Sequence, residues 1–320
     1  MLKEFTERDE KMSLDLLKNV LMKLPDCDSW TAQILKINIS KRSGTSYLCR
    51  DLLFSPDDRL HDFVKEISEK YVKNEKSDFY KFTGISEYDG STLGEMIYKL
   101  EADNLLIKDD LVKLIDSIGN PDVEINPLEI RAQAYLMKGI VTIDAEQHAV
   151  KLISMQNPIT TLKHKFFRAN GVFKEISDKV ISLRTSIDVV ILDQTVYMLT
   201  LAGEKLFDME RSYKATCIQK ISEIEASNMV NNFEEFSNIA SSGQNPRKFV
   251  SFNESHFEKL RNINSRRRLA KKFKIPLDGD KFDMTQKGAA DKLVKLLCNR
   301  AMIDPFDEHP MEVAGSRKWE

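Results

Sequence analysis

The chain has 320 residues, of which 42% are hydrophobic and 31% are charged. This balance is typical of a globular protein and excludes a disordered or collagen-like chain. The net charge of -2 creates no general attraction to nucleic acid, so such a role would depend on how charge is distributed along the chain. No apolar run approaches the ~20 residues that span a bilayer, and the charged N-terminus lacks the apolar core of a signal peptide. We therefore expect a cytoplasmic protein.

The N-terminal region, residues 1–125, is expected to be α+β. Leucines at positions 14, 17, 21 and 24 predict an amphipathic helix over residues 2–24. Alternating apolar and polar residues predict a hairpin of strands 32–40 and 46–54. Helices are predicted over residues 60–72, 92–100 and 109–118. Two proline-containing turns, at residues 119–121 and 126–127, then place a domain boundary between residues 125 and 126.

The second region, residues 126–320, is predicted to place strands before helices. Strands are expected at 132–143 and 148–155, with further segments at 160–169 and 171–180. Two β-branched runs, 187–192 and 195–201, are joined by Asp193-Gln194 and predict a tight hairpin. Helices follow over residues 206–226, 233–240, 254–273 and 285–299, with a loop at 241–246. Strands followed by helices favour an α+β fold with a strand-rich middle and a mostly helical C-terminal part.

Familiar catalytic and cofactor motifs are absent from the sequence. It contains no glycine-rich dinucleotide or P-loop motif, no Gly-x-Ser-x-Gly and no His-Glu-x-x-His. The four cysteines, at positions 27, 49, 217 and 298, form no Cys-x-x-Cys pair and have no histidine at zinc-finger spacing. We expect reduced thiols, no cofactor, no metal and no enzymatic activity.

One acidic segment leaves an alternative open. Asp278, Asp280 and Asp283 stand close enough in sequence to hold Mg²⁺ or Ca²⁺, although the spacing is not that of an EF-hand. A metal-dependent nuclease built on these three residues is therefore a third functional hypothesis. The simpler interpretation is a solvated loop, with Asp283 or Thr285 capping the following helix.

Positive charge is concentrated between Pro246 and Lys274. The only acids in this interval are Glu254 and Glu258. On a helix, Arg267, Lys271 and Lys274 would share one face, while Leu260, Ile263 and Leu269 would point inward. Arginine and lysine at this spacing suit phosphate groups, because guanidinium and ammonium groups neutralise the nucleic-acid backbone. The candidate nucleic-acid-binding residues are Arg247, Lys248, Arg266, Arg267, Arg268, Lys271, Lys272 and Lys274.

From about residue 173 to the C-terminus the chain resembles the KwaB family. KwaB is the soluble component of the Kiwa anti-phage defence system. The resemblance rests on residues 171–173, 188–193, 196–199, 204–208 and 293–297, on Tyr213 and on the basic tail 315–318. Members of that family often carry an aspartate within the segment 297–301. This chain has Cys298-Asn299-Arg300 there and departs from the pattern.

The resemblance implies a homodimer that binds DNA without strong sequence preference and blocks the use of phage DNA. It also implies a membrane-embedded partner, KwaA, which would recruit the protein to the inner membrane. An alternative from another functional class is an adaptor whose basic face docks on an acidic partner or on anionic lipid.

Overall fold

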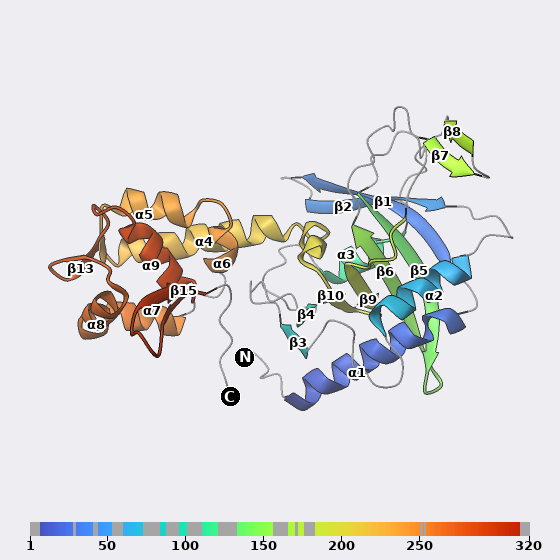
Figure 1. Cartoon of the computed structure of the whole chain (residues 1–320), viewed down its shortest axis with the longest axis horizontal. Coiled ribbons are helices and arrows are strands. Elements are labelled where there is room, and N and C mark those ends of the chain that lie inside the picture. The colour runs from blue at the N-terminus through green and yellow to red at the C-terminus, as the bar shows by residue number, and fades with distance from the viewer. Residues whose placement is uncertain are drawn as a thin grey trace. The chain divides into compact units, whose positions relative to one another are not determined.

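The computed structural model describes residues 7–27, 30–40, 44–52, 60–72, 84–87, 96–100, 111–120, 133–155, 166–169, 172–175, 183–249, 252 and 254–313. These residues form two units, which are treated separately below. The first unit takes its described residues from the chain up to Asp208, and the second begins at Met209 (Figure 1).

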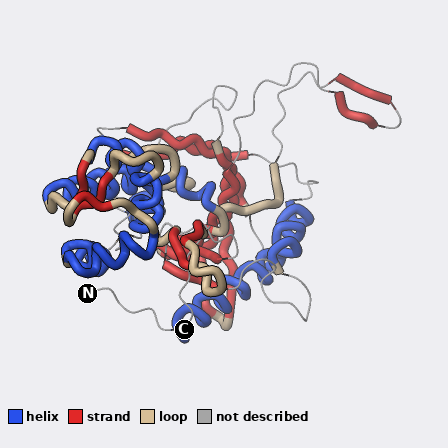
Figure 2. The backbone as a smooth tube through the Cα atoms, turned by 60° about the vertical axis from the view of Figure 1, so that its left-hand side comes forward, coloured by secondary structure: helices blue, strands red, loops and turns tan. Residues whose placement is uncertain are grey.

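The first unit is built on an eight-stranded sheet. Its strand order is β2-β1-β5-β6-β9-β10-β4-β3, and neighbours are antiparallel except for the parallel pair β3 and β4. Figure 2 shows these strands in red. The strands are β1 (Thr31–Ser40), β2 (Gly44–Leu52), β3 (Gly84–Glu87), β4 (Met96–Leu100), β5 (Ala134–Ile143), β6 (Glu146–Met155), β9 (Val189–Leu192) and β10 (Thr195–Met198). A separate two-stranded ribbon pairs β7 (Phe166–Ala169) with β8 (Val172–Glu175).

Helices cover both faces of this sheet. The first face carries α1 (Glu7–Lys23), the 3-10 turn η1 (Leu24–Asp26) and α2 (Leu60–Tyr71), whose apolar side chains join those of the strands in one buried cluster. Met137 of β5 and Leu152 of β6 are paired residues in that cluster. Because side chains alternate along a strand, the next pair, Lys138 and Lys151, faces the opposite side.

The opposite face carries α3 (Leu111–Ser117), and two lysines satisfy its C-terminal carbonyls. Lys151 Nζ donates to Ile115 O at 2.5 Å and to Ile118 O at 2.8 Å. Lys138 Nζ donates to Gly119 O at 2.6 Å. Gly119 has a φ of 85°, which ends the helix in the left-handed region and favours glycine. The pKa of Lys151 is lowered, first by burial and then by the charge of Lys138.

A buried carboxylate fastens the β9–β10 hairpin to its neighbours. Asp188 Oδ2 accepts from the backbone N–H of Met155 at 2.7 Å, and its Oδ1 accepts from Thr200 Oγ1 at 2.5 Å. The backbone of Asp188 also bonds to Ile153 and Leu199. Thr200 then begins the 3-10 turn η2 (Leu201–Lys205), which leads out of the sheet.

The second unit is mainly helical and has its own hydrophobic core. Phe236, Phe249 and Phe282 are among its fully buried side chains. Short strands form a three-stranded and a two-stranded sheet at its edges. Its elements are α4 (Met209–Ala226), β11 (Val230–Asn231), α5 (Phe233–Ala240), α6 (Asn245–Lys248), α7 (Glu254–Arg261), α8 (Ile263–Phe273), β12 (Leu277–Asp278), β13 (Lys281–Asp283), α9 (Ala289–Leu297), β14 (Ala301–Ile303) and β15 (Pro310–Glu312).

The predicted α+β class is confirmed, with a strand-rich middle followed by helices. The predicted hairpin at 187–201 is confirmed as β9 and β10, and α5 occupies the predicted residues. The helix predicted over 92–100 is wrong where the structure describes it, because residues 96–100 form β4. That strand is buried on both sides and pairs with β10 and β3, so it lacks the polar alternate face that marks a half-buried strand.

The two units do not meet at the expected boundary between residues 125 and 126. Strands from both sides of that position share one sheet, since β1 pairs with β5 and β4 pairs with β10. The structure instead divides after Asp208, where η2 gives way to α4. The proline turns at 121 and 127 lie outside the described residues.

Candidate nucleic-acid interface

The basic segment forms two helices rather than the single helix predicted over residues 254–273. The chain breaks at Asn262, which has extended backbone angles (φ -72°, ψ 115°) and accepts a hydrogen bond from Ser265 N at 2.9 Å through its side chain. This is N-cap chemistry, and it starts α8 in a new direction after α7 ends. Of the residues predicted to face inward, Leu260 is buried, but Ile263 is 46% exposed because α8 begins at that residue.

Arg266 is buried and belongs to the interior of this helix pair. Its Nε donates to Leu260 O at 2.8 Å, and its guanidinium also donates to the backbone carbonyls of Arg261 at 3.3 Å and Asp280 at 2.5 Å. Burial lowers the pKa of its guanidinium, and the nearby charge of Asp280 opposes that effect. Arg266 therefore holds the end of α7 against the β12–β13 turn, and its guanidinium is engaged within the fold.

Arg267 is exposed but already has a charged partner. Its Nε and Nη2 lie 2.7 and 2.6 Å from Asp280 Oδ1. The pair is solvated, with 59% of the Arg267 side chain exposed, so its energy is small. The aspartate nevertheless cancels much of the positive charge that this arginine would offer to a phosphate.

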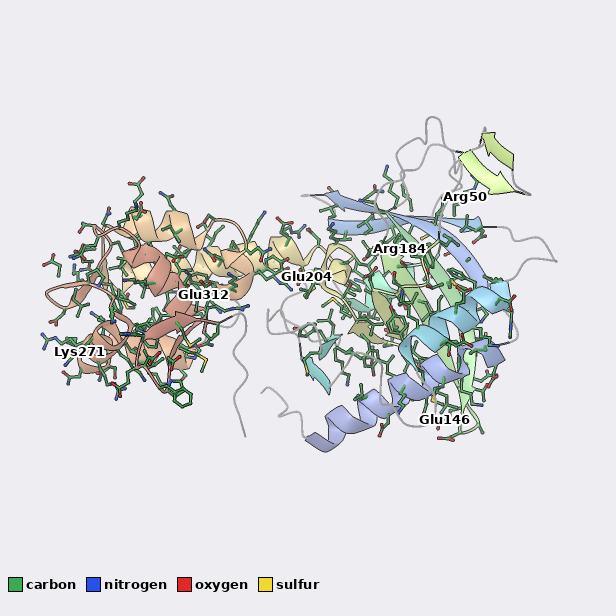
Figure 3. The ribbon with its side chains drawn as sticks, in the orientation of Figure 1. Arg50, Glu146, Arg184, Glu204, Lys271 and Glu312 are labelled. Carbon is green, nitrogen blue, oxygen red and sulfur yellow. The ribbon has the colours of Figure 1, made fainter. Side chains whose placement is uncertain are left out.

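The next turn of α8 presents three exposed cations. Arg268, Lys271 and Lys272 are all exposed, and none forms an ion pair with a residue that the structure describes. Their spacing of three and four residues places the side chains on adjoining turns of one helix face. Lys271 is labelled in Figure 3, at the α8 end of the second unit. This trio is called the α8 face below.

The other predicted cations lie apart from the α8 face. Arg247 and Lys248 are half-buried on α6, which packs against α4 and α5. Lys274 follows α8 in the left-handed conformation (φ 53°), and its Nζ lies 3.3 Å from His309 Nδ1. Of the eight predicted residues, three therefore form one continuous exposed surface, and Lys274 lies next to it in the chain.

The structure adds two lysines that the sequence interpretation missed. A shallow hollow of about 240 Å³ at the start of α9 is lined by Lys274, Lys287 and Lys292, with Gln286 between them. Lys292 Nζ also donates to Lys274 O at 3.2 Å, which ties α9 to the end of α8. An acidic loop separates these lysines from the basic run in the sequence, and only the folded β12–β13 hairpin brings them together.

The acidic segment uses its carboxylates within the fold. Asp278 accepts from Asn231 Nδ2 at 2.8 Å, Asp280 pairs with Arg267, and Asp283 Oδ1 accepts from the backbone N–H and hydroxyl of Thr285. The hydrogen bonds from Thr285 lower the pKa of Asp283. In the described part of the chain no three histidine, cysteine, aspartate or glutamate side chains gather as they would around a metal ion. The predicted helix cap is wrong, because α9 starts at Ala289 with Gly288 as its N-cap.

Comparison with known protein families gives a match over residues 132–304, just over half of the chain, to the family described as Kiwa protein KwaB-like. The chain belongs to the KwaB-like family. The matched region runs from the start of β5 to β14, and it contains every cation of the α8 face and of the lysine hollow. Membership implies a role in Kiwa anti-phage defence, a system in which KwaB-like proteins work with partner proteins.

Two further comparisons found no curated protein and no solved structure that matches the chain. Within the described residues, no helix is both long and apolar enough to span a bilayer.

The segment 297–301, in which members of the family often carry an aspartate, contains Arg300 in this chain. Arg300 is buried and donates to Val313 O at 3.4 Å. The four cysteines are free thiols, and three of them are buried.

Proposed function

We propose that this KwaB-like protein binds double-stranded DNA without strong sequence preference through the α8 face, and thereby blocks the use of phage DNA. The observation that carries the proposal is the exposed trio Arg268, Lys271 and Lys272, whose charges no described acid balances. The three lysines of the neighbouring hollow extend the positive surface. Such a surface contacts phosphates and provides little reading of bases, so affinity depends on released counterions.

Two further parts of the proposal follow from the family. We propose that the protein acts as a homodimer, which would double the number of phosphate contacts and steepen the dependence of binding on salt. We also propose that a membrane-embedded partner of the KwaA kind recruits it from the cytoplasm to the inner membrane.

The test is fluorescence anisotropy with a labelled duplex of arbitrary sequence at several salt concentrations. The site variant carries Arg268→Gln, Lys271→Gln and Lys272→Gln. The slope of log K against log[salt] changes by about 0.9 for each phosphate that the protein no longer neutralises. We expect the slope to become shallower by about 2 to 3 units, and the variant to bind all sequences more weakly to the same extent.

A matched control removes the same charge elsewhere. Lys23→Gln, Lys65→Gln and Lys214→Gln alter three exposed lysines that sit in local ion pairs with acids on their own helices or turns. The control should keep the slope of the unaltered protein. Equal weakening in both variants would mean that only total charge matters, and an unaltered protein that fails to bind at low salt would contradict the proposal.

If DNA binding fails, the adaptor hypothesis is tested with the same variants. Flotation with anionic liposomes, with and without the membrane partner, would then show whether the α8 face meets lipid or protein. Recovery of the unaltered protein but not of the α8-face variant in the floating fraction would support that function instead.

A further inference from the structure

A groove of about 470 Å³ lies between α7, α8 and the end of α9. Its apolar floor includes Leu260, Leu269 and Phe273, and its rim carries Lys259, Arg268 and Lys272. Among the described residues, every charged side chain that lines this groove is basic. A groove of this kind suits an apolar side chain that is flanked by carboxylates.

The same unit also carries an exposed aromatic side chain that is flanked by acidic residues. Phe306 stands in the turn between β14 and β15 with 92% of its surface exposed. Asp304, Asp307 and Glu308 surround it in the sequence, and Asp307 and Glu308 are exposed. We call residues 304–308 the acidic tip.

Hydrogen bonds from the backbone to the Asp304 carboxylate and within the backbone hold the acidic tip in shape. Asp304 Oδ1 accepts from the N–H groups of Phe306 at 2.8 Å and Asp307 at 3.1 Å. Asp304 O accepts from Glu308 N at 3.0 Å, and Asp304 N donates to His309 O at 2.9 Å. Because the turn is closed on itself, little backbone ordering is needed when the phenylalanine enters a pocket.

We propose that the groove of one copy of this chain receives the acidic tip of a second copy, with Phe306 on the apolar floor. The carboxylates of the tip then face the cations Lys259, Arg268 and Lys272 of the rim. Each copy carries both tip and groove, and in a dimer that closes about a two-fold axis the contact is made twice. Charge complementarity between the acidic tip and the basic rim selects this groove for the exposed phenylalanine.

The proposed contact is small compared with a standard protein interface. An aromatic side chain buries roughly 150–250 Å² when it enters a pocket, so two such contacts with their polar flanks fall short of a standard interface of about 1,600 Å². We therefore expect a reversible dimer whose dissociation constant rises with salt concentration.

This contact supplies an interface for the homodimer of the proposed function, and it rests on that part of the proposal alone. Arg268 and Lys272 of the α8 face line the groove, so the tip of the second copy competes with DNA for these two cations. Lys271 and the hollow formed with Lys287 and Lys292 lie outside the residues that line the groove. A dimer made in this way leaves those cations exposed, and its formation is measured without nucleic acid. A protein that dimerises through the tip but binds no DNA, or the reverse, would therefore be recognised as such.

The first experiment is sedimentation equilibrium of the full chain, without DNA, over a range of protein and salt concentrations. Phe306→Ser removes the anchor from an exposed turn, so the fold should be retained. Truncation of an interface anchor typically weakens binding by about 30-fold or more, and we expect at least that change in the dissociation constant. The control is Ile218→Ser, which removes another exposed apolar residue (62% exposed, on α4) and should change nothing.

The second experiment uses complementation. A rim variant with Lys259→Glu, Arg268→Glu and Lys272→Glu should be monomeric, as should Phe306→Ser. When the two are mixed, the tip of the rim variant meets the intact groove of the Phe306→Ser chain, and one of the two contacts returns. A mixed dimer that neither variant forms alone is the expected result. A monomeric unaltered protein, an unchanged dissociation constant in Phe306→Ser or a mixture without dimer would each overturn the proposal.

Discussion

Arg266 illustrates how a basic residue can serve the fold instead of a ligand. It donates to three backbone carbonyls, from α7 and from the β12–β13 turn, while its neighbours Arg267 and Arg268 face solvent. Three adjacent arginines in the sequence thus have three different roles: one is structural, one is paired and one is available to a partner. The difference follows from the helical rotation of about 100° between successive residues.

Arg266→Met should therefore destabilise the second unit. The substitution keeps the apolar stem and leaves the carbonyl groups without their charged donor, so we expect the free energy of unfolding to fall by about 3 kcal/mol. Urea denaturation followed by circular dichroism measures this. Arg268→Met on the exposed side of the same helix should change stability by less than about 0.5 kcal/mol, and an equal effect of both would contradict the assigned role.

Cys298 provides a second prediction at this scale, through pH. Burial raises the pKa of its thiol from 9.0 to about 12. The stabilisation linked to the neutral thiol is fully present below pH 9 and disappears as pH rises through the folded-state value. Between about pH 9 and 11 this group alone should lower the free energy of unfolding by about 1.4 kcal/mol per pH unit.

The measurement compares the unaltered chain with Cys298→Ala at about pH 8, 9, 10 and 11, a range that spans the ordinary thiol pKa. The variant should be less stable at the lowest of these values, because it leaves a small cavity, and the difference should narrow as pH rises. A stability difference that stays constant with pH would contradict the raised pKa.

At the scale of elements, the break between α7 and α8 depends on Asn262. Its side chain caps the first turn of α8, which carries the cations of the proposed DNA surface. Asn262→Ala should lower the free energy of unfolding by about 1 kcal/mol. Asn264→Ala, two positions later on the exposed helix surface, is the control. It should lower the free energy of unfolding by only about 0.3 kcal/mol. Chemical denaturation of both variants makes the comparison, and equal effects would argue against a cap.

Local patterns in the sequence predicted some elements and missed others for identifiable reasons. The β9–β10 hairpin and α5 were predictable because turn residues and apolar periodicity lie within a few adjacent positions. The strand β4 was not, because its apolar run Met-Ile-Tyr with Leu100 fits either a buried helix or a buried strand, and its partner β10 is remote in sequence. Asn262 was also missed, since a capping residue inside a charged run resembles any other polar residue.

The candidate surface was predictable only in part. Charge density identified the interval that contains Arg268, Lys271 and Lys272, but could not separate them from the buried Arg266. Lys287 and Lys292 join the surface through tertiary packing alone. Periodicity on one long helix was the wrong basis for choosing faces, because α8 starts afresh after Asn262.

At the scale of the whole molecule, the two units have separate buried clusters that share no residue. We expect them to unfold in separate transitions rather than as one cooperative block. Trp30 reports on the first unit, because it packs against that cluster and its indole donates to Leu24 O at 3.3 Å. With Trp319→Phe as background, tryptophan fluorescence then follows the first unit alone.

Under these conditions Arg266→Met should shift the transition seen by circular dichroism and leave the fluorescence midpoint unchanged. The sensitivity of circular dichroism to the second unit comes from its high helix content. A shift of both midpoints by the same amount would show that the units unfold together.

The order of strands in the large sheet also has a consequence during synthesis. The β1–β2 hairpin leaves the ribosome early, but the other edge of β1 must wait for β5, whose paired residues begin at Ala134. At about 5–20 residues per second, translation of the intervening segment takes several seconds or more. Throughout that interval a nascent strand rich in Ile and Leu has an unpaired edge, which is the kind of surface that chaperones and neighbouring nascent chains recognise. Slowing translation between codons 53 and 133 should therefore lower the yield of folded protein more than the same delay placed after codon 208.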